Sequence, residues 1–238
     1  MKKIIILLAI ILLPNIIYAK EFEIKDINFK VDVADDFYVL TRENLDNNTD
    51  LSKIGISKSY MEETMKKNNI YMDILKKDIS YEILVVVPDK VLLFDNLNNA
   101  TDNMIEELKV ELVKKTNATN SGIYKTKYNF VMVDYFDKNT GYYIVNYYTV
   151  FNSKGYNIQL QKKSAITSIE RDYIKNLVDT INIEKISENK NEKNNEEVDN
   201  IKSDFNYKNI IIGAIIGIVF GLISYIISLI IKKRKSSN

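Results

Sequence analysis

Residues 141–160 read GYYIVNYYTVFNSKGYNIQL, and the fold class can be inferred from this stretch and its surroundings. Strand-favouring β-branched and aromatic residues are concentrated at 142–152 and 156–162, and NSKG at 152–155 between them is typical of a turn. The preceding segment, 124–136, has a similar composition and is followed by a second turn-like segment, DKNTG at 137–141. Three strands separated by two turns predict an antiparallel three-stranded meander.

Tyrosines recur within the middle strand of this meander. Because side chains alternate across a strand, Tyr142 and Tyr148 are predicted on one face, and Tyr143 and Tyr147 on the other. Tyrosine is a favoured strand residue and one face must contact helices, so we expect a role in the core. The alternative is a partner surface, because aromatic side chains often anchor interfaces.

Shorter sequence patterns on both sides of the meander predict the rest of the domain. Helices are indicated by apolar residues at helical spacing, and strands by alternation or short apolar runs. The resulting order, ββ-α-ββ-α-βββ-α-β, predicts an α+β domain in which an antiparallel sheet is covered by helices. Before the meander, the predicted segments are a hairpin of strands at 29–33 and 37–40, a helix at 59–68, strands at 70–75 and 81–87, a helix at 101–115 and a loop at 117–122.

Two sites match the Ser/Thr-x-x-Glu capping box that marks helix N-termini, namely Ser59 with Glu62 and Thr167 with Glu170. A last short strand at 181–183 is predicted to close the sheet. The helix that opens at Thr167 has a predicted buried stripe of Ile169, Tyr173, Ile174, Leu177 and Val178.

The order of these elements resembles the PsbP-like superfamily over about 27–183. The stretches that carry the resemblance are NFKVDVADDFYVL (28–40), GISKSYMEETMKKNNIYMDIL (55–75) and the late hairpin at 141–160. It implies a curved antiparallel sheet between helices. It also implies a non-catalytic binding or assembly module, in a membrane-anchored extracytoplasmic protein of low-GC Gram-positive type.

Residues 210–231 form an apolar run that predicts a transmembrane helix. Such a helix is about 33 Å long, enough for a hydrocarbon core of about 30 Å. The basic tail at 232–238 begins directly after it and is predicted to be cytoplasmic. Three glycines at four-residue spacing share one helix face: Gly213, Gly217 and Gly221. They predict a helix–helix contact, although small residues are also common in membrane helices that form no dimer.

Residues 1–19 have the three regions of a secretory signal peptide. Lys2 and Lys3 precede an apolar stretch at 4–13, and cleavage is predicted after Ala19 although Ile17 departs from the Ala-x-Ala pattern. An uncleaved membrane anchor is the alternative. With the span, this predicts a single-pass plasma-membrane protein whose domain lies outside the cytoplasm. That domain occupies 20–184, and a flexible tether rich in Lys, Glu and Asn occupies 185–209.

The composition excludes several classes of function. The chain contains no Cys and no His, which excludes disulfides, ordinary catalytic triads and the usual zinc centres. Residues 20–209 carry 27 basic and 32 acidic residues, a net charge of −5, which argues against nucleic-acid binding. Neither G-x-S-x-G nor a glycine-rich phosphate loop occurs, so we expect no catalytic site and no cofactor.

Two Asp/Asn-rich segments resemble the start of a calcium-binding loop. DNNTD at 46–50 places oxygen atoms at alternate positions, but Leu51 and Ser57 occupy the sixth and twelfth positions, where Gly and Glu are needed. The segment at 137–141 fails in the same way, with Tyr148 at its twelfth position. We therefore interpret both segments as turns and predict no metal site.

These features favour a non-enzymatic, membrane-anchored extracytoplasmic module that binds an envelope component or supports assembly of a membrane complex. The alternatives are a sensor or adhesin that captures a soluble ligand, and an enzyme with an unrecognised site. The predicted partners are the lipid bilayer, an envelope protein and a second copy of the chain through its transmembrane helix.

Overall fold

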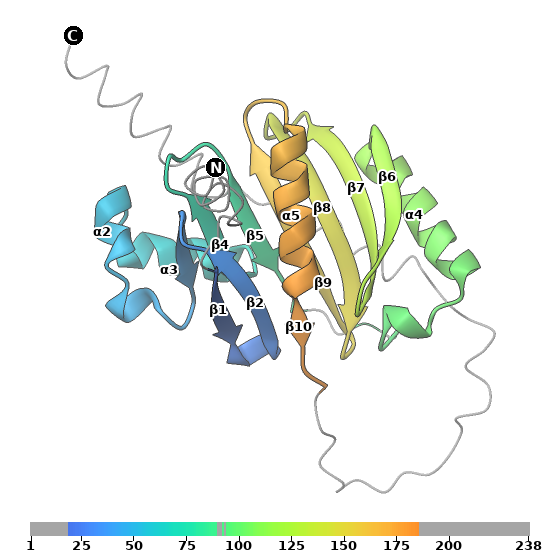
Figure 1. The fold of residues 1–238 in the computed structure, drawn as a ribbon, viewed down its shortest axis with the longest axis horizontal. Coiled ribbons are helices and arrows are strands. Elements are labelled where there is room, and N and C mark those ends of the chain that lie inside the picture. The colour runs from blue at the N-terminus through green and yellow to red at the C-terminus, as the bar shows by residue number, and fades with distance from the viewer. Residues whose placement is uncertain (1–18, 90–91, 93, 186–238) are drawn as a thin grey trace, which may run out of the picture.

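A computed structural model describes residues 19–89, 92 and 94–185 (Figure 1). The predicted signal peptide, almost all of the tether, the predicted span with Gly213, Gly217 and Gly221, and the basic tail lie outside the described residues. Among the helices that are described, none combines the length and apolar character needed to cross a membrane.

The described chain alternates strands with a few helices. In order, its elements are β1 (Ala19–Ile24), η1 (Lys25–Ile27), β2 (Phe29–Ala34), β3 (Phe37–Thr41), η2 (Leu45–Asn47), α2 (Asp50–Ile54), α3 (Lys58–Lys67), β4 (Ile70–Lys76), β5 (Glu82–Val86), η3 (Leu97–Asn99), α4 (Asp102–Thr116), β6 (Asn120–Lys125), β7 (Asn129–Asp137), β8 (Tyr142–Phe151), β9 (Lys154–Lys162), α5 (Ser168–Thr180) and β10 (Asn182–Ile183).

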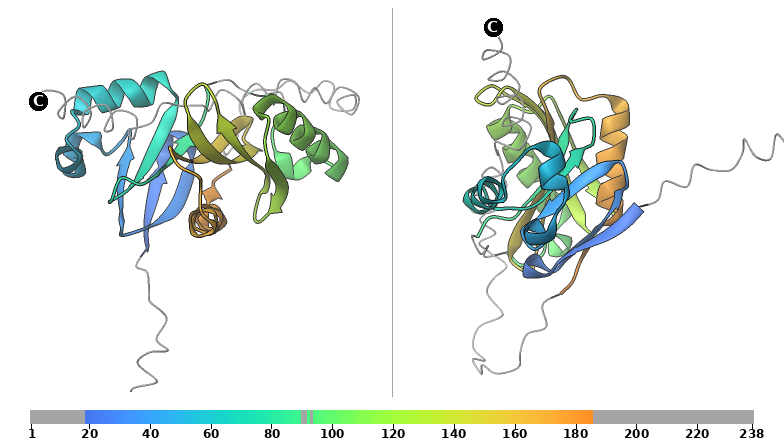
Figure 2. Two further views of the ribbon diagram at one scale, coloured as in Figure 1. Left: turned by 90° about the horizontal axis from the view of Figure 1, so that it is seen from above. Right: turned by 90° about the vertical axis from the view of Figure 1, so that its left-hand side faces the viewer.

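These elements form three layers (Figure 2). The middle layer is a seven-stranded sheet in the order β3-β4-β5-β9-β8-β7-β6, and every neighbouring pair is antiparallel. Helices α2, α3 and α4 lie on one face, which we call the helix side. Helix α5 and a small sheet, β1-β2-β10, lie on the other face, which we call the small-sheet side. The predicted α+β class with an antiparallel sheet is confirmed, with a second sheet added.

The predicted meander is present, and it contains four strands. The region predicted as one strand at 124–136 is divided into β6 and β7, and the loop predicted at 117–122 is wrong because β6 begins at Asn120. The turn between these strands is closed by Thr126, whose N–H donates to the Tyr128 carbonyl oxygen at 3.0 Å and whose Oγ1 accepts from the Tyr128 N–H at 3.2 Å. No Gly or Pro marks this turn in the sequence.

The hairpin between β8 and β9 forms where the sequence predicts it. Phe151 pairs with Lys154, so the loop contains only Asn152 and Ser153. Their φ angles are 51° and 56°, and positive φ at both central positions is what a type I′ turn requires. That turn matches the right-handed twist of the two long strands it joins.

The predicted opening hairpin is wrong. Strand β2 pairs with β1 and β10 in the small sheet, whereas β3 pairs with β4 at the edge of the large sheet. Strand β10, predicted to close the main sheet, pairs instead with β2. The chain passes from one sheet to the other at the two residues 35–36, and local alternation cannot distinguish such a transition from a hairpin.

One of the two predicted capping boxes is present. The Thr167 Oγ1 accepts from the Glu170 N–H at 3.3 Å, and the Glu170 Oε2 accepts from the Thr167 N–H at 2.7 Å. Helix α3 starts differently, because the Ser57 Oγ accepts from the Tyr60 N–H at 3.3 Å and Ser59 lies inside the first turn. The box predicted at Ser59 and Glu62 is therefore wrong.

The buried face of α5 is narrower than predicted. Ile174, Leu177 and Val178 are buried and Tyr173 packs against them, but Ile169 is 79% exposed. Ile169 lies five residues before Ile174, which places it about 140° around the helix. The predicted stripe was therefore too wide by one residue.

Candidate functional site

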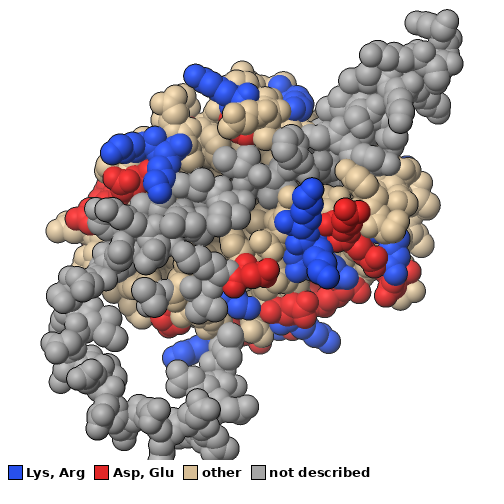
Figure 3. Space-filling view, turned by 180° about the vertical axis from the view of Figure 1, so that it is seen from behind, with Lys and Arg blue, Asp and Glu red and all other residues tan. Residues whose placement is uncertain are grey.

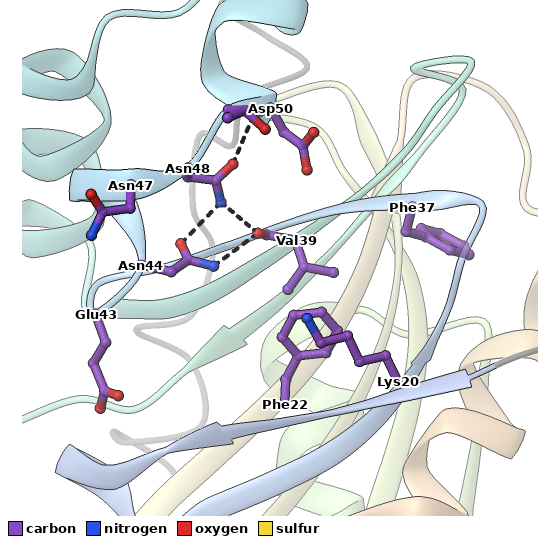
Figure 4. A pocket seen from close by; sticks show the side chains of 10 residues that line it. Lys20, Phe22, Phe37, Val39, Glu43, Asn44, Asn47, Asn48 and Asp50 are labelled. Atoms are coloured by element: carbon purple, nitrogen blue, oxygen red, sulfur yellow. Dashed lines mark hydrogen bonds between the residues drawn. The ribbon is translucent and has the colours of Figure 1, made fainter.

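A pocket of about 460 Å³ lies where the small sheet meets the edge of the large sheet (Figure 4). Lys20 and Phe22 reach it from β1, and Phe37 and Val39 reach it from β3. The remaining wall is formed by residues 43–44 and 47–50, which lead into α2. This volume is within the range of small-molecule sites, about 300–1,000 Å³.

The apolar wall of the pocket is supported from behind. Phe37 is only 5% exposed, and its ring stacks on Tyr173 of α5 with the ring centroids 4.7 Å apart. Tyr81 meets the same ring edge-on at 5.8 Å. Val39 is also buried, and Phe22 is half-buried. The Lys76 ammonium also lies over the Phe37 ring, 4.5 Å from its centre. Because three neighbours fix this ring, the wall needs little ordering to receive a ligand.

Two asparagine amides hold the polar wall in place. Val39 lies on the edge strand β3, and its carbonyl oxygen accepts from the Asn44 Nδ2 at 3.1 Å and from the Asn48 Nδ2 at 2.9 Å. The two side chains are also joined, because the Asn48 Nδ2 donates to the Asn44 Oδ1 at 3.1 Å. The amides thus take the place of a neighbouring strand and fix the segment to the sheet edge (Figure 4).

The pocket carries charges of opposite sign. The Lys20 ammonium lies 5.2 Å from the centre of the Phe22 ring and makes no ion pair with any other described residue. On the opposite wall, Asp50 accepts from the Lys53 Nζ through Oδ1 at 2.7 Å. Glu43 is engaged elsewhere, because its Oε1 accepts the backbone N–H of Lys25 at 2.8 Å. A cation and a carboxylate therefore border one partly apolar space.

The calcium-like segment 46–50 forms part of this wall, but its oxygen atoms do not converge. Asp46 pairs with Lys58, the Asn48 Oδ1 accepts the Asp50 N–H at 2.9 Å, and Asp50 pairs with Lys53. Over the part of the chain that the structure describes, no three acidic side chains are grouped to hold a metal ion.

The second calcium-like segment, 137–141, closes the turn between β7 and β8. The Asp137 Oδ1 accepts from the Asn139 N–H at 3.0 Å, and its Oδ2 accepts from the Thr140 N–H at 3.3 Å. Gly141 completes the turn at a φ of 72°, where glycine is favoured. The Asp137 carboxylate is therefore used to shape the turn. A second pocket, of about 390 Å³, lies beside this turn and the end of α4.

The tyrosines of β8 alternate as predicted. Tyr142 and Tyr148 are buried in the core of the helix side, and Tyr147 is buried on the small-sheet side. Burial raises the pKa of Tyr147 to about 12, so it stays neutral. Tyr143 is 36% exposed and its ring lies 4.8 Å from that of Phe136. The expected core role is confirmed for three of the four residues.

A strip of buried polar side chains crosses the helix side of the large sheet. Strand β9 contributes Asn157, Gln159 and Gln161, none more than 1% exposed. The Gln161 Nε2 donates to the Glu82 Oε1 at 2.6 Å, and the Gln159 Nε2 donates to the Gln161 Oε1 at 2.8 Å. Beside them, the Asn146 Nδ2 donates to the Asn157 Oδ1 at 3.1 Å. The strip is thus linked mainly through its own amides.

Asp73 of β4 borders this strip and is fully buried. Neither of its carboxylate oxygens has a hydrogen-bond partner among the residues that the structure describes. Burial, together with the charge of Glu82, raises the pKa of the Asp73 carboxyl well above its usual range. Its paired neighbours on β3 and β5 are Leu40 and Leu84, so the protonated acid lies in a largely apolar setting.

The surface of the helix side is mixed in charge. Over the parts of that face formed by described residues, basic and acidic side chains are interspersed (Figure 3). Some form ion pairs within a single helix: Lys58 pairs with Glu62 on α3, and Lys109 pairs with Glu106 on α4.

The β1 side of the pocket was missed by sequence reasoning. Lys20 and Phe22 directly follow the predicted signal peptide, and the first predicted strand began at 29. The segment KEFEI at 20–24 nevertheless alternates, with Phe22 and Ile24 separated by charged residues. That period of two was the available signal for β1.

No protein-family model matches the chain, and no curated protein sequence matches it. A similar solved structure is the solution structure of cyanobacterial PsbP (CyanoP) from Synechocystis sp. PCC 6803, with a TM-score of 0.42 and 8% sequence identity. The match covers 72% of this chain and 95% of that chain. At this identity and TM-score, the match carries no argument about fold or function.

Proposed function

We propose that this protein is a non-enzymatic, membrane-anchored extracytoplasmic module that binds another component of the cell envelope. The observation that carries the proposal is the preformed pocket beside β1, with an apolar wall, an amide-held polar wall and opposite charges at its border. We place the domain with the PsbP-like modules of low-GC Gram-positive type on the sequence resemblance. In this proposal the predicted signal peptide directs export, and the predicted span at 210–231 is the membrane anchor.

Binding is favoured over catalysis by the chemistry of the lining residues. The chain has no His or Cys to act as a base or nucleophile. Glu43 and Asp50 already accept hydrogen bonds, from the backbone of Lys25 and from Lys53. Lys20 is exposed, and its ammonium lies near an aromatic ring and forms no ion pair with a carboxylate of the described residues. An acid–base pair would need two groups within hydrogen-bonding reach of one reacting atom.

The predicted topology can be tested with single cysteines, because the natural chain has none. Asp35→Cys places a thiol on an exposed residue of the domain, and Ser237→Cys places one in the basic tail. A membrane-impermeant maleimide should label the first variant in intact cells and the second only after lysis. Labelling of both or neither in intact cells, or the reverse pattern, would contradict the proposal.

Partner binding can be tested by photo-crosslinking in intact membranes. A photoreactive amino acid in place of Asn47 lies at the exposed border of the pocket, and one in place of Glu63 on α3 serves as the matched control. We expect an adduct that is specific to the Asn47 position. Recovery of uncrosslinked monomer only, or the same adducts from both positions, would argue against a partner at this pocket.

The alternative is a sensor or adhesin that captures a soluble ligand, and the size of the pocket favours it. In that case the Asn47 position gives no protein adduct. The full chain in mild detergent should then show a ligand-dependent rise in its melting temperature, because a ligand that binds only the folded state stabilises it.

A further inference from the structure

In the pocket beside β1, the Lys20 ammonium and the Asp50 carboxylate lie on opposite walls with apolar side chains between them (Figure 4). The other carboxylate of the lining, Glu43, accepts the backbone N–H of Lys25. Lys20 is exposed, and its ammonium has no carboxylate partner among the described residues. Asp50 uses Oδ1 for its pair with Lys53, and its side chain is 28% exposed. Phe22, Phe37 and Val39 form the wall between these two charges.

We infer that this pocket binds a small zwitterion with an apolar body, of the amino-acid or short-peptide class. The carboxylate of the ligand would pair with Lys20, its ammonium with Asp50, and its side chain would cover Phe22 and Phe37. A ligand with a single charge would leave one wall unpaired, whereas a purely apolar ligand would desolvate both charges without compensation. The inference rests on the proposal that this pocket is the binding site, and it names a small soluble ligand for that site, as the sensor alternative requires.

The polar wall fits a ligand that also carries peptide-like groups. The Asn44 and Asn48 amides are occupied by Val39 and by each other, so their positions are fixed. Asn47 is different, because it is exposed at the border of the pocket and its side-chain amide makes no hydrogen bond to another described residue. It can donate to and accept from an amide group of a ligand.

The geometry also explains why the site can be preformed. Phe37 is stacked on Tyr173, and the segment 43–50 is tied to β3 by the two asparagines and to η1 by Glu43. Lys20 and Phe22, at the start of β1, and the side chain of Asn47 are held less tightly, since all three are at least partly exposed. Little conformational freedom is therefore lost on binding.

The charge assignment is tested by calorimetric titration of the full, uncleaved chain in mild detergent, in which position 20 has no α-ammonium of its own. The probes are L-phenylalanine, its amide, which lacks the carboxylate, and its N-acetyl derivative, which lacks the ammonium. We expect L-phenylalanine to bind about tenfold more tightly than either derivative, because each derivative loses one charge-assisted contact. Lack of binding by L-phenylalanine up to millimolar concentration would overturn the inference.

Two variants assign each contact to its wall. Lys20→Gln should bind L-phenylalanine and its amide equally, and still prefer L-phenylalanine to the N-acetyl derivative. Asp50→Asn should bind L-phenylalanine and its N-acetyl derivative equally, and still prefer L-phenylalanine to its amide. The matched controls Lys66→Gln and Glu63→Gln, both at exposed positions of α3, should keep both preferences. If Lys20→Gln and Asp50→Asn also keep both preferences, the assigned site is wrong.

Failure of this inference is distinguishable from failure of the proposed function. If cysteine labelling and the Asn47-specific adduct are observed but no probe binds, the module function stands and the zwitterion site is wrong. If L-phenylalanine binds with the expected charge dependence but Asp35→Cys is not labelled from outside, the site stands and the proposed location is wrong.

Discussion

Strand β9 presents chemically unlike side chains to the two faces of the large sheet, and both sets are buried. Its residues Tyr156, Ile158 and Leu160 enter the apolar core of the small-sheet side. Its alternate residues Asn157, Gln159 and Gln161 enter the polar strip of the helix side. None of the six is more than 1% exposed. Burial alone therefore does not determine what stabilises a face.

The two faces depend on different interactions. The small-sheet side is stabilised by removal of apolar area from water and by close packing, which tolerate a polar group poorly. The strip on the helix side depends on complete hydrogen bonding, and that is not achieved, because Asp73 and the Asn146 Oδ1 lack partners. The comparison predicts that equivalent changes on the two faces have different, and in one case opposite, effects on stability.

The largest effect is expected from exchanging polarity at neighbouring positions of β9. Ile158→Asn buries an unpaired amide and removes a packed side chain, so the free energy of unfolding should fall by about 4 kcal/mol. Gln159→Leu removes one hydrogen bond to Gln161, which still donates to Glu82, and should cost only about 1 kcal/mol. Urea unfolding of the full chain in mild detergent, followed by circular dichroism, measures both values.

Val110→Ala is the matched control for this pair, since Val110 on α4 is 57% exposed. It should change the unfolding free energy by less than about 0.5 kcal/mol. Equal losses for Ile158→Asn and Gln159→Leu would show that the two faces are not energetically distinct.

A smaller loss is expected at the one buried ion pair that joins α5 to β9. The Lys162 Nζ and the Glu170 Oε1 are 2.6 Å apart, and their side chains are 10% and 13% exposed. Glu170→Gln removes the charge from this pair and weakens the capping box with Thr167. We expect a loss of about 2–3 kcal/mol in the same unfolding measurement.

Glu107→Gln on α4 is the control for this change. Glu107 is exposed, so its substitution should have little effect on stability. If Glu170→Gln also leaves the free energy of unfolding unchanged, the charge of the Lys162–Glu170 pair does not contribute to stability on the small-sheet side.

The sequence predicted the local elements better than their pairing. The β7–β8–β9 meander follows from alternation and short turns, and the Thr167 capping box follows from side-chain spacing. Membership of β2 in a separate sheet could not be inferred, because its partners are β1 and β10, near opposite ends of the described chain. Such pairing is set by tertiary packing, whereas sequence patterns report neighbours along the chain.

The candidate site was less accessible to sequence reasoning than the fold. The segment 46–50 was identified as oxygen-rich and interpreted as a turn, but its role in holding the edge strand β3 depends on the Val39 carbonyl. Lys20 joins that segment only because the small sheet packs beside it. The helix–helix contact at Gly213, Gly217 and Gly221 stays a prediction, since those residues are outside the described ranges.

An opposite effect is expected at Asp73. Asp73→Val replaces a buried, unpartnered carboxyl with a strand-favouring apolar side chain, and should raise the free energy of unfolding by about 1–2 kcal/mol. Asp32→Val is the control, because Asp32 on β2 is exposed and should change stability by less than about 0.5 kcal/mol. A loss of stability at Asp73→Val would mean that the carboxyl makes a favourable interaction in the folded state.

The pH dependence provides the finest distinction between the two faces, with a slope of at most about 1.4 kcal/mol per pH unit for each group. The pKa of Asp73 is raised by burial and by Glu82. The pH-dependent cost of burying Asp73 is therefore absent below the unfolded pKa, about 3.9, and grows as the pH rises toward the folded pKa. The advantage of Asp73→Val over the natural chain should thus grow as the pH increases from about 4.

Glu170 should give the opposite slope. Burial favours its protonation, but hydrogen bonds from Lys162 and Thr167 outweigh burial and lower its pKa. Its contribution is complete above the unfolded pKa, about 4.3, and is lost as the pH falls through the folded pKa, so the deficit of Glu170→Gln should shrink in acid. Unfolding free energies should therefore be measured from pH 3 to 8 for the natural chain and both variants. Relative to the natural chain, the value should rise with pH for Asp73→Val and fall with pH for Glu170→Gln. Parallel slopes would mean that the two carboxyls do not have opposite pKa shifts, and the contrast between the two faces would then be one of packing alone.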